Sequence, residues 1–196
     1  AVVKAQPRDA DGRRKLQECE HALRKQRFEE AIRTPEVAVV KVSETIDAKA
    51  MVVENAYDGA RMEDDSTLTS DFITDMVSRF KSGKTIHMRY AYEILLQAKS
   101  IFEQLPSIQD ISIDAGEHFT VCGDIHGQFF DLCNIFEING YPSEINPYLF
   151  NGDFVDRGSF SVEVILTLLA FKCLYPTGMY LTRGNHETAA MNKMYG

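Results

Sequence analysis

The sequence lacks any long hydrophobic run. Its longest apolar stretch, VILTLLAF at residues 164–171, has eight residues, whereas a helix that spans a bilayer needs about 20. Residues 1–15 contain no apolar segment of the kind that forms the centre of a secretory signal peptide. We therefore expect neither a signal peptide nor a membrane partner.

Cysteine is scarce, and the cysteines present show no paired spacing. Cys19, Cys122, Cys133 and Cys173 are scattered, without a Cys-x-x-Cys motif. The last three lie in apolar segments, where an unpaired cysteine behaves as a small hydrophobic side chain. The pattern disfavours a disulfide framework and favours a reducing compartment, the cytoplasm or the nucleus.

Positive charge is also in short supply. The chain has 21 basic and 29 acidic residues, and a net charge of −8 disfavours nucleic acid as a partner. Residues 1–33 carry nine basic and six acidic side chains, whereas the remainder carries 12 and 23. With 44% hydrophobic residues the chain can build one well-packed domain and an appendage, and the change in charge near Pro35 predicts their boundary.

Hydrophobic periodicity predicts helices in the first half of the chain. Residues 9–32 have apolar positions separated by charges, as in an amphipathic helix or a pair of helices. Residues 34–54 have a weaker pattern, typical of a connector with short extended pieces. Two clear helices are expected at 69–84, which a threonine or serine can cap, and at 86–105, which ends before a proline.

In the second half, short apolar strands alternate with helices. Strands are expected at 118–122, 147–151 and 178–182, and helices at 129–138 and 161–175. This alternation predicts an α/β fold whose sheet is parallel and has right-handed crossovers.

A polar, glycine-flanked cluster follows each expected strand: GDIHGQ, then GDFVDRG, then RGNHE. Asp124 and Asp153 are 29 residues apart, and Asp153 and Asn185 are 32 apart, each about one strand–helix–strand step. Because ligands bind at the carboxyl ends of parallel strands, we expect the three loops to form one site.

The candidate metal ligands in these loops offer carboxylate or amide oxygen and imidazole nitrogen: Asp124, His126, Asp153 and Asn185. Such a set suits Mn, Fe, Zn or Mg better than a thiolate-bound ion. A carboxylate can bridge two ions about 4 Å apart. Asp153, in the middle loop, is the natural bridge.

Arg157 and Arg183 stand beside these ligands, and guanidinium groups bind phosphate oxygens in a planar, bidentate manner. Each cluster alone could be an ordinary strand-to-helix loop with a capping aspartate. Three clusters at strand ends, with metal ligands and arginines together, favour a site. We expect His21, His87 and His118 to have packing or turn roles instead.

The three clusters resemble the signature motifs of the metal-dependent serine/threonine protein phosphatases, and the resemblance covers residues 57–196. The segments ECEHALRKQRFEEAI and YDGARMEDD resemble most the type five protein phosphatases, which carry tetratricopeptide helices ahead of the catalytic domain. The resemblance implies a calcineurin-like metallophosphoesterase β-sandwich with flanking helices. It implies that residues 1–33 end a tetratricopeptide region, that 34–56 form a linker, and that 57–196 begin the catalytic domain.

The resemblance also implies two divalent metal ions. Asp124, His126 and Asp153 would hold the first ion, and Asp153 and Asn185 would contribute to the second. A hydroxide bridging the two ions would attack the phosphorus of a phosphoserine or phosphothreonine.

Four residues would act on the substrate by the same resemblance. Arg157 and Arg183 would bind the phosphoryl oxygens and stabilise their charge in the transition state. His186 would protonate the leaving serine or threonine oxygen, and Asp156 would orient His186.

In that family the catalytic domain continues well past the position of Gly196, and the chain begins at Ala1 rather than Met. We therefore expect a truncated chain with an incomplete second metal site, one ion at best, and poor stability or no activity. Its partners would be phosphoprotein substrates and, through a tetratricopeptide region upstream, a chaperone. Two alternatives remain, a non-catalytic interaction fragment and a small-molecule metallophosphoesterase.

Overall fold

A computed structural model describes residues 9–33, 42–63, 67–114 and 116–195. The chain divides into two compact units: one contains the helices α2 and α7, and the other contains the described residues from Val42 to Glu187. In the described ranges, no helix is both long enough and apolar enough to cross a membrane.

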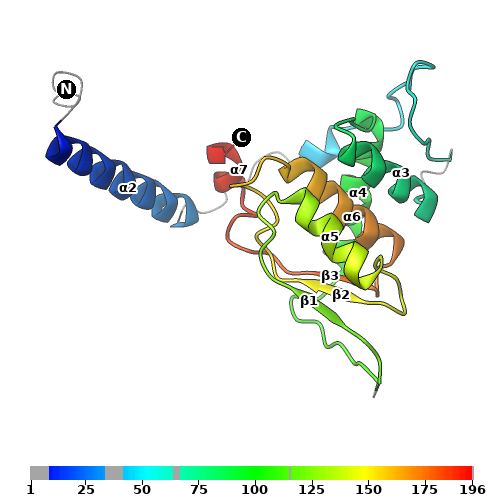
Figure 1. The fold of residues 1–196 in the computed structure, drawn as a ribbon. Helices are drawn as coiled ribbons and strands as arrows, with labels where there is room; N and C mark the ends of the chain where they lie inside the picture. Colours follow the sequence, from blue (N-terminus) through cyan, green and yellow to red (C-terminus); the bar gives the residue numbers. More distant parts are fainter. Residues whose placement is uncertain (1–8, 34–41, 64–66, 115, 196) are drawn as a thin grey trace. The chain divides into compact units, whose positions relative to one another are not determined.

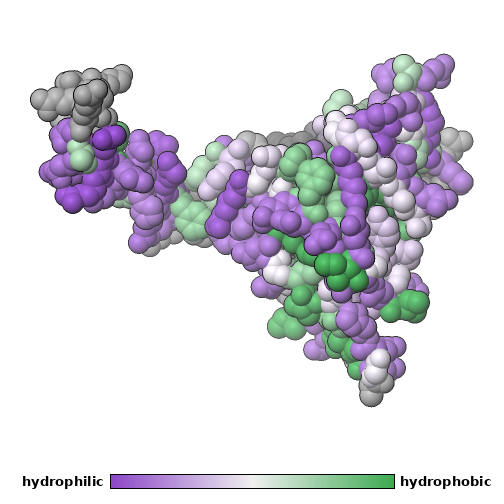
Figure 2. Space-filling model, viewed as in Figure 1, coloured by the Kyte–Doolittle hydropathy of each residue, from purple (hydrophilic) through white to green (hydrophobic). Residues whose placement is uncertain are grey.

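The smaller unit contains the predicted N-terminal helix and one helix that the pattern did not predict. The helix α2, Ala10–Arg33, is one continuous helix rather than a pair, and its surface is mainly hydrophilic (Figures 1 and 2). Its apolar positions Leu16 and Leu23 are about half-exposed. The unexpected helix α7, Ala189–Tyr195, begins after Thr188, whose hydroxyl accepts the N–H of Met191 at 3.2 Å.

The larger unit begins with the two helices predicted most clearly. The helix α3, Ser70–Lys81, is capped by Thr69, whose Oγ1 accepts the N–H of Phe72 at 3.2 Å. The helix α4 spans Met88–Gln104. Of the expected connector, residues 34–41 lie outside the described ranges; residues 42–54 contain a 3-10 helix, η1 at Val42–Glu44, and no strand.

The three predicted strands form one parallel sheet in the order β1-β2-β3. They are β1 (Thr120–Cys122), β2 (Tyr148–Phe150) and β3 (Met179–Leu181), each shorter than the apolar run that predicted it. Every strand is therefore joined to the next by a crossover that contains a helix, as expected.

The crossover helices α5 (Phe129–Asn139) and α6 (Ser161–Leu174) cover one face of this sheet (Figure 1). The helices α3 and α4 pack against α6, which is why α6 is apolar on nearly all sides. The core between the layers includes Tyr148, Phe150 and Ile94, all with 0% exposure. Val121, on the other face of β1, is 66% exposed.

Lys172 is a buried cation near the end of α6, with 1% exposure. Its ammonium group donates to the carbonyl oxygens of Pro176 at 2.7 Å and Met179 at 2.8 Å, and it lies 5.4 Å from the centre of the Tyr180 ring. Burial lowers the pKa of Lys172. The side chain thus joins the end of α6 to the start of β3, and so fixes where the last strand begins.

All four cysteines are free thiols, as the spacing predicted. Burial raises the pKa of Cys122 and Cys133, and it raises the pKa of Cys173 to about 12. These three thiols are therefore unreactive packing groups at neutral pH.

An ion cluster around Asp58 holds the segment before α3. Arg79 Nη2 donates to Asp58 Oδ1 at 2.7 Å, and Lys84 Nζ donates to Oδ2 at 2.6 Å. The hydrogen bonds from Lys84 and from Arg79 lower the pKa of Asp58 from 3.8 to about 2. The ionised carboxylate is thus favoured in the folded state over the unfolded one.

Replacing Asp58 with asparagine is expected to destabilise the protein at neutral pH and to matter less in acid. Because the folded pKa is lowered, the contribution of the carboxylate is fully present above pH 3.8 and is lost as the pH falls through about 2. Urea unfolding of both proteins across this range measures the difference, and added salt should reduce it because Asp58 is exposed. A difference that stays constant down to the lowest pH would contradict the assignment.

Candidate metal centre

The loops that follow the three strands meet at one place, as the alternation of strands and helices predicted. His126 lies after β1, Asp153 after β2 and His186 after β3. One potential ligand atom from each of these residues lies within 4.8 Å of the other two. Residues 60 positions apart in sequence therefore face a common point.

The four predicted ligands differ in how closely the structure groups them. Asp124 Oδ2 lies 3.7 Å from His126 Nε2, and Asp153 Oδ2 lies 3.9 Å from the same nitrogen. Asn185 is exposed on the loop that carries His186. Asp124 and Asp153 thus lie beside the imidazole of His126. The assignment of all four residues as metal ligands stays a prediction.

Backbone contacts lock the loops together. The N–H groups of Ile125 and His126 both donate to the carbonyl oxygen of Asp153, at 3.1 and 2.9 Å. The third loop passes so close to the second that a Cβ atom on Gly152 would overlap the backbone nitrogen of Gly184. Glycine at position 152 is therefore required for the loops to approach.

The backbone of this site is strained. His126, Asp153, Asp156 and Arg157 have φ values of 46°, 50°, 69° and 65°, and they are all of the non-glycine residues with positive φ in the described ranges. This left-handed region costs an L-residue about 1–2 kcal/mol, although Asp and His tolerate it better than most residues. Strain of this kind concentrates at functional sites, which favours a site over ordinary connecting turns.

The hydrogen bonds of the His126 ring show whether these residues fit a metal ion. Its Nδ1 lies 2.9 Å from the carbonyl oxygen of Val155. Because a carbonyl oxygen only accepts, Nδ1 carries the proton, and Nε2 of the neutral ring carries a lone pair. Nε2 is buried, has no hydrogen-bond partner among the described residues, and faces the carboxylates of Asp124 and Asp153. A cation would satisfy all three groups, so the residues present fit a divalent metal ion.

His186 is completely buried and is held by two of the predicted catalytic residues. Its Nδ1 lies 2.8 Å from Asp156 Oδ2, and its backbone N–H donates to Asp153 Oδ1 at 2.9 Å. Its Nε2 lies 3.3 Å from Arg157 Nη2 and accepts a hydrogen bond, since a guanidinium only donates. The ring is thus fixed between a carboxylate and a guanidinium.

The two predicted phosphate-binding arginines have different surroundings. Arg157 is exposed and contacts His186 within the cluster. Arg183 is also exposed, and it borders a cavity beside β3 together with Tyr180 and Thr182. The described contacts therefore place Arg157, but not Arg183, within the cluster. The phosphate-binding role of each arginine stays a prediction.

Glu187 is a residue of the site to which the sequence pattern gave no role. Its Oε2 accepts the N–H groups of Asp153 at 2.7 Å and Gly184 at 2.9 Å, and its Oε1 accepts the N–H of Phe154 at 2.7 Å. One carboxylate therefore holds the second and third loops in register. Its position at the end of the RGNHE cluster was the available signal, but its partners are backbone groups, which a sequence pattern does not reveal.

Replacing Glu187 with glutamine is expected to weaken metal binding by about 10–100-fold, as is typical when a group that orients metal ligands is lost. The amide would place N–H donors against backbone N–H donors, whereas the carboxylate accepts from all three. Mn²⁺ titration by calorimetry measures the effect. The exposed Glu144→Gln serves as the control, and equal Mn²⁺ affinity in the two variants would contradict the positioning role.

Comparison with known protein families agrees with this geometry. Residues 117–196 match the family of calcineurin-like phosphoesterases, and residues 16–110 match the family described as PPP5 TPR repeat region. The second range includes α3 and α4, which in this structure pack against α6.

Relatives similar to the chain over its full length are serine/threonine-protein phosphatases. They include phosphatase 5 of Arabidopsis thaliana, 47% identical, and phosphatase 5 of Homo sapiens, 48% identical; the chain covers 46% and 39% of these proteins. A solved Saccharomyces cerevisiae phosphatase structure, described as similar to human PP5, matches with a TM-score of 0.58 and 40% identity, over 66% of this chain and 42% of that one. The chain belongs to the PPP5 family of serine/threonine phosphatases, with a TPR region and a partial calcineurin-like phosphoesterase domain. It spans less than half the length of these relatives.

Proposed function

We propose that the protein, at the full length of its relatives, is a serine/threonine protein phosphatase that hydrolyses phosphoserine and phosphothreonine with the help of two divalent metal ions. The 196 residues by themselves would hold one ion at best. One observation carries the proposal: the buried, unpartnered Nε2 of His126 faces two carboxylates beside an oriented histidine. This combination would supply a cation site next to a proton donor, which are the two requirements of metal-assisted phosphoester hydrolysis.

The metal ligands in this proposal are Asp124, His126, Asp153 and Asn185. When bound, the ions would supply Lewis-acid activation of a water molecule and neutralise charge on the phosphoryl group. Asp153 reaches the cluster through both oxygens, since Oδ2 faces His126 while Oδ1 accepts from the backbone of His186. Asp153 would therefore fix the position of the metal ligand His126 relative to the proposed general acid His186. Mn, Fe, Zn and Mg all suit this donor set.

The substrate would be held and protonated by the remaining residues. Arg157 and Arg183 would bind the phosphoryl oxygens, a task that suits planar guanidinium groups. Once Arg157 turns to the phosphate, Nε2 of His186 would be free to take up a proton from water and to pass it to the leaving alkoxide oxygen. Asp156 would keep the ring in place through Nδ1.

The domain arrangement and partners complete the proposal. Residues 1–33 would end a tetratricopeptide region, 34–56 would link it, and 57–196 would begin a catalytic domain whose β-sandwich contains the β1–β3 sheet. The partners would be phosphoprotein substrates and a chaperone that binds the tetratricopeptide region, in the cytoplasm or nucleus. The relatives' printed names and the TPR match support these roles.

A direct test compares substrates in the presence of Mn²⁺, with the chain extended to the full length of its relatives. Release of phosphate from a phosphoserine peptide, abolished by a chelator and restored by Mn²⁺, is the expected result. Preferential hydrolysis of a dinucleotide polyphosphate would indicate a small-molecule phosphoesterase instead. Mn²⁺ binding without hydrolysis of either substrate would indicate a non-catalytic interaction fragment.

A further inference from the structure

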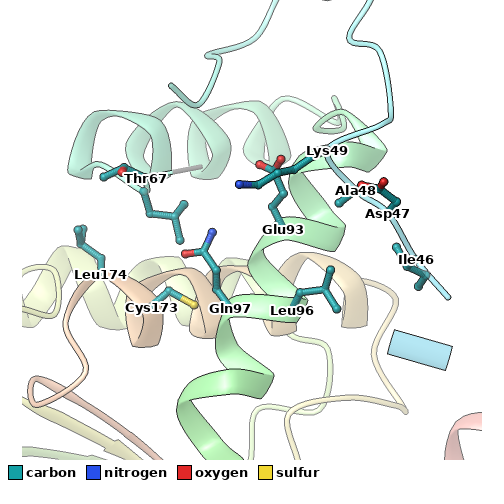
Figure 3. A pocket seen from close by; sticks show the side chains of 11 residues that line it. Ile46, Asp47, Ala48, Lys49, Thr67, Glu93, Leu96, Gln97, Cys173 and Leu174 are labelled. Carbon is teal, nitrogen blue, oxygen red and sulfur yellow. The ribbon is translucent and has the colours of Figure 1, made fainter. Parts of the chain in front are cut away.

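A second cavity lies in the larger unit, away from the strand ends. It has a volume of about 660 Å³, within the range of about 300–1,000 Å³ that is typical of small-molecule sites. Its walls come from residues 46–49, from residues 67–68 before α3, from α4 and from the end of α6 (Figure 3). No wall residue belongs to the three loops of the candidate metal centre.

Much of this cavity is apolar. Ala48 and Leu68 are buried, with exposures of 4% and 6%, and Leu96 and Leu174 also border the space. Cys173, on the same wall, is a neutral thiol at physiological pH. These groups can pack against a hydrocarbon body but do not orient it.

Glu93 is the exception in this wall. Its side chain is only 4% exposed, and its Oε1 pairs with Arg89 Nε at 2.9 Å. Its Oε2 is buried and accepts no hydrogen bond from the residues that the structure describes. A buried carboxylate oxygen without a donor is unfavourable, so a ligand that brings a donor to it would gain free energy.

Two further charges stand at the rim. Asp47 and Lys49 are exposed and opposite in sign, and Asp47 Oδ1 accepts the N–H of Ala50 at 3.1 Å. Among the described contacts, no ion pair joins Lys49 to Glu93. The rim is therefore nearly neutral, and Glu93 sets the charge preference inside.

We propose that this cavity binds a small molecule with an apolar body and a protonated nitrogen, whose N–H group donates to Glu93 Oε2. The apolar walls would take the body, and the carboxylate would select a primary ammonium or guanidinium over a neutral or anionic head group. The site is independent of the proposed phosphatase activity, because it shares no residue with the metal centre.

The experiment uses hexylammonium, hexanol and hexanoate as probes of the purified protein, with binding measured by calorimetry or protein NMR. Hexylammonium is expected to bind at least about tenfold more tightly than hexanol, since hydrogen bonds to charged groups contribute about 1.5–3 kcal/mol. Hexanoate should bind most weakly. Equal binding of hexylammonium and hexanol would overturn the proposal.

Two variants locate the binding. Glu93→Gln should remove most of the preference for hexylammonium, whereas Glu103→Gln should not, although Glu103 forms an equivalent pair with Lys99 on the same helix at 2.8 Å. If Glu93→Gln does not fold, hexylammonium binding is measured with Leu96→Trp instead, because the tryptophan fills the cavity and leaves Glu93 in place. Hexylammonium that still binds to Leu96→Trp would overturn the proposal.

Discussion

Asp153→Asn is expected to weaken Mn²⁺ binding by more than about 100-fold, because loss of an outer-shell partner alone typically costs about 10–100-fold. In the unsubstituted protein the N–H of His186 donates to Asp153 Oδ1 at 2.9 Å. The asparagine keeps an oxygen that can accept this hydrogen bond, so the loops should still fold. It loses the negative charge that faces His126 Nε2. In a protein of the relatives' full length, hydrolysis of a phosphoserine peptide should fall by at least about 10²–10³-fold, as for removal of a main electrostatic stabiliser.

The matched control for this variant is Asp110→Asn, an exposed aspartate outside the three loops. Mn²⁺ affinity is measured by calorimetry and folding by circular dichroism. An Asp153→Asn protein that binds Mn²⁺ as tightly as the control would show that the cluster does not hold the metal.

In a protein of the relatives' full length, Asp156→Asn is expected to lower kcat on a phosphoserine peptide by about 10²-fold or more, with little change in KM. Asp156 contacts His186 Nδ1 at 2.8 Å, and general acid catalysis contributes about 10²–10⁴-fold. Without the carboxylate, the imidazole loses the acceptor that fixes its Nδ1 and thereby orients the ring. KM should change little, because in the proposed mechanism Arg157, and not Asp156, would bind the phosphate.

A change of leaving group separates this role from simple loss of structure. Nitrophenolate leaves without being protonated, so Asp156→Asn should hydrolyse p-nitrophenyl phosphate almost as well as the wild type does. Asp131→Asn, at the exposed start of α5, is the control. Equal losses on both substrates would assign Asp156 to structure alone.

The order of helices and strands in the larger unit was predictable, because each element has its own periodicity and turn residues. The stripe of apolar residues in α3 and the threonine before it indicated both the helix and its start. The helix α7 was missed because it is only seven residues long and too short to show a period. The exact strand lengths were missed because apolar residues continue beyond the paired backbone.

The site was predictable only as a set of residue types at strand ends. That His126 has a free lone pair depends on the carbonyl of Val155, which lies 29 residues along the chain. The role of Glu187 depends on three backbone N–H groups of neighbouring loops. Contacts of this kind arise from the tertiary arrangement and leave no mark on residue spacing.

The positive φ of Arg157 has a consequence for directed evolution. His and Asp tolerate this backbone conformation, but arginine gains nothing from it, and glycine would adopt it at lower cost. A library screened only for resistance to heat should therefore enrich Arg157→Gly, while a library screened for turnover should reject it. The substitution at this position that is expected to raise thermal stability is therefore also expected to lower catalytic activity.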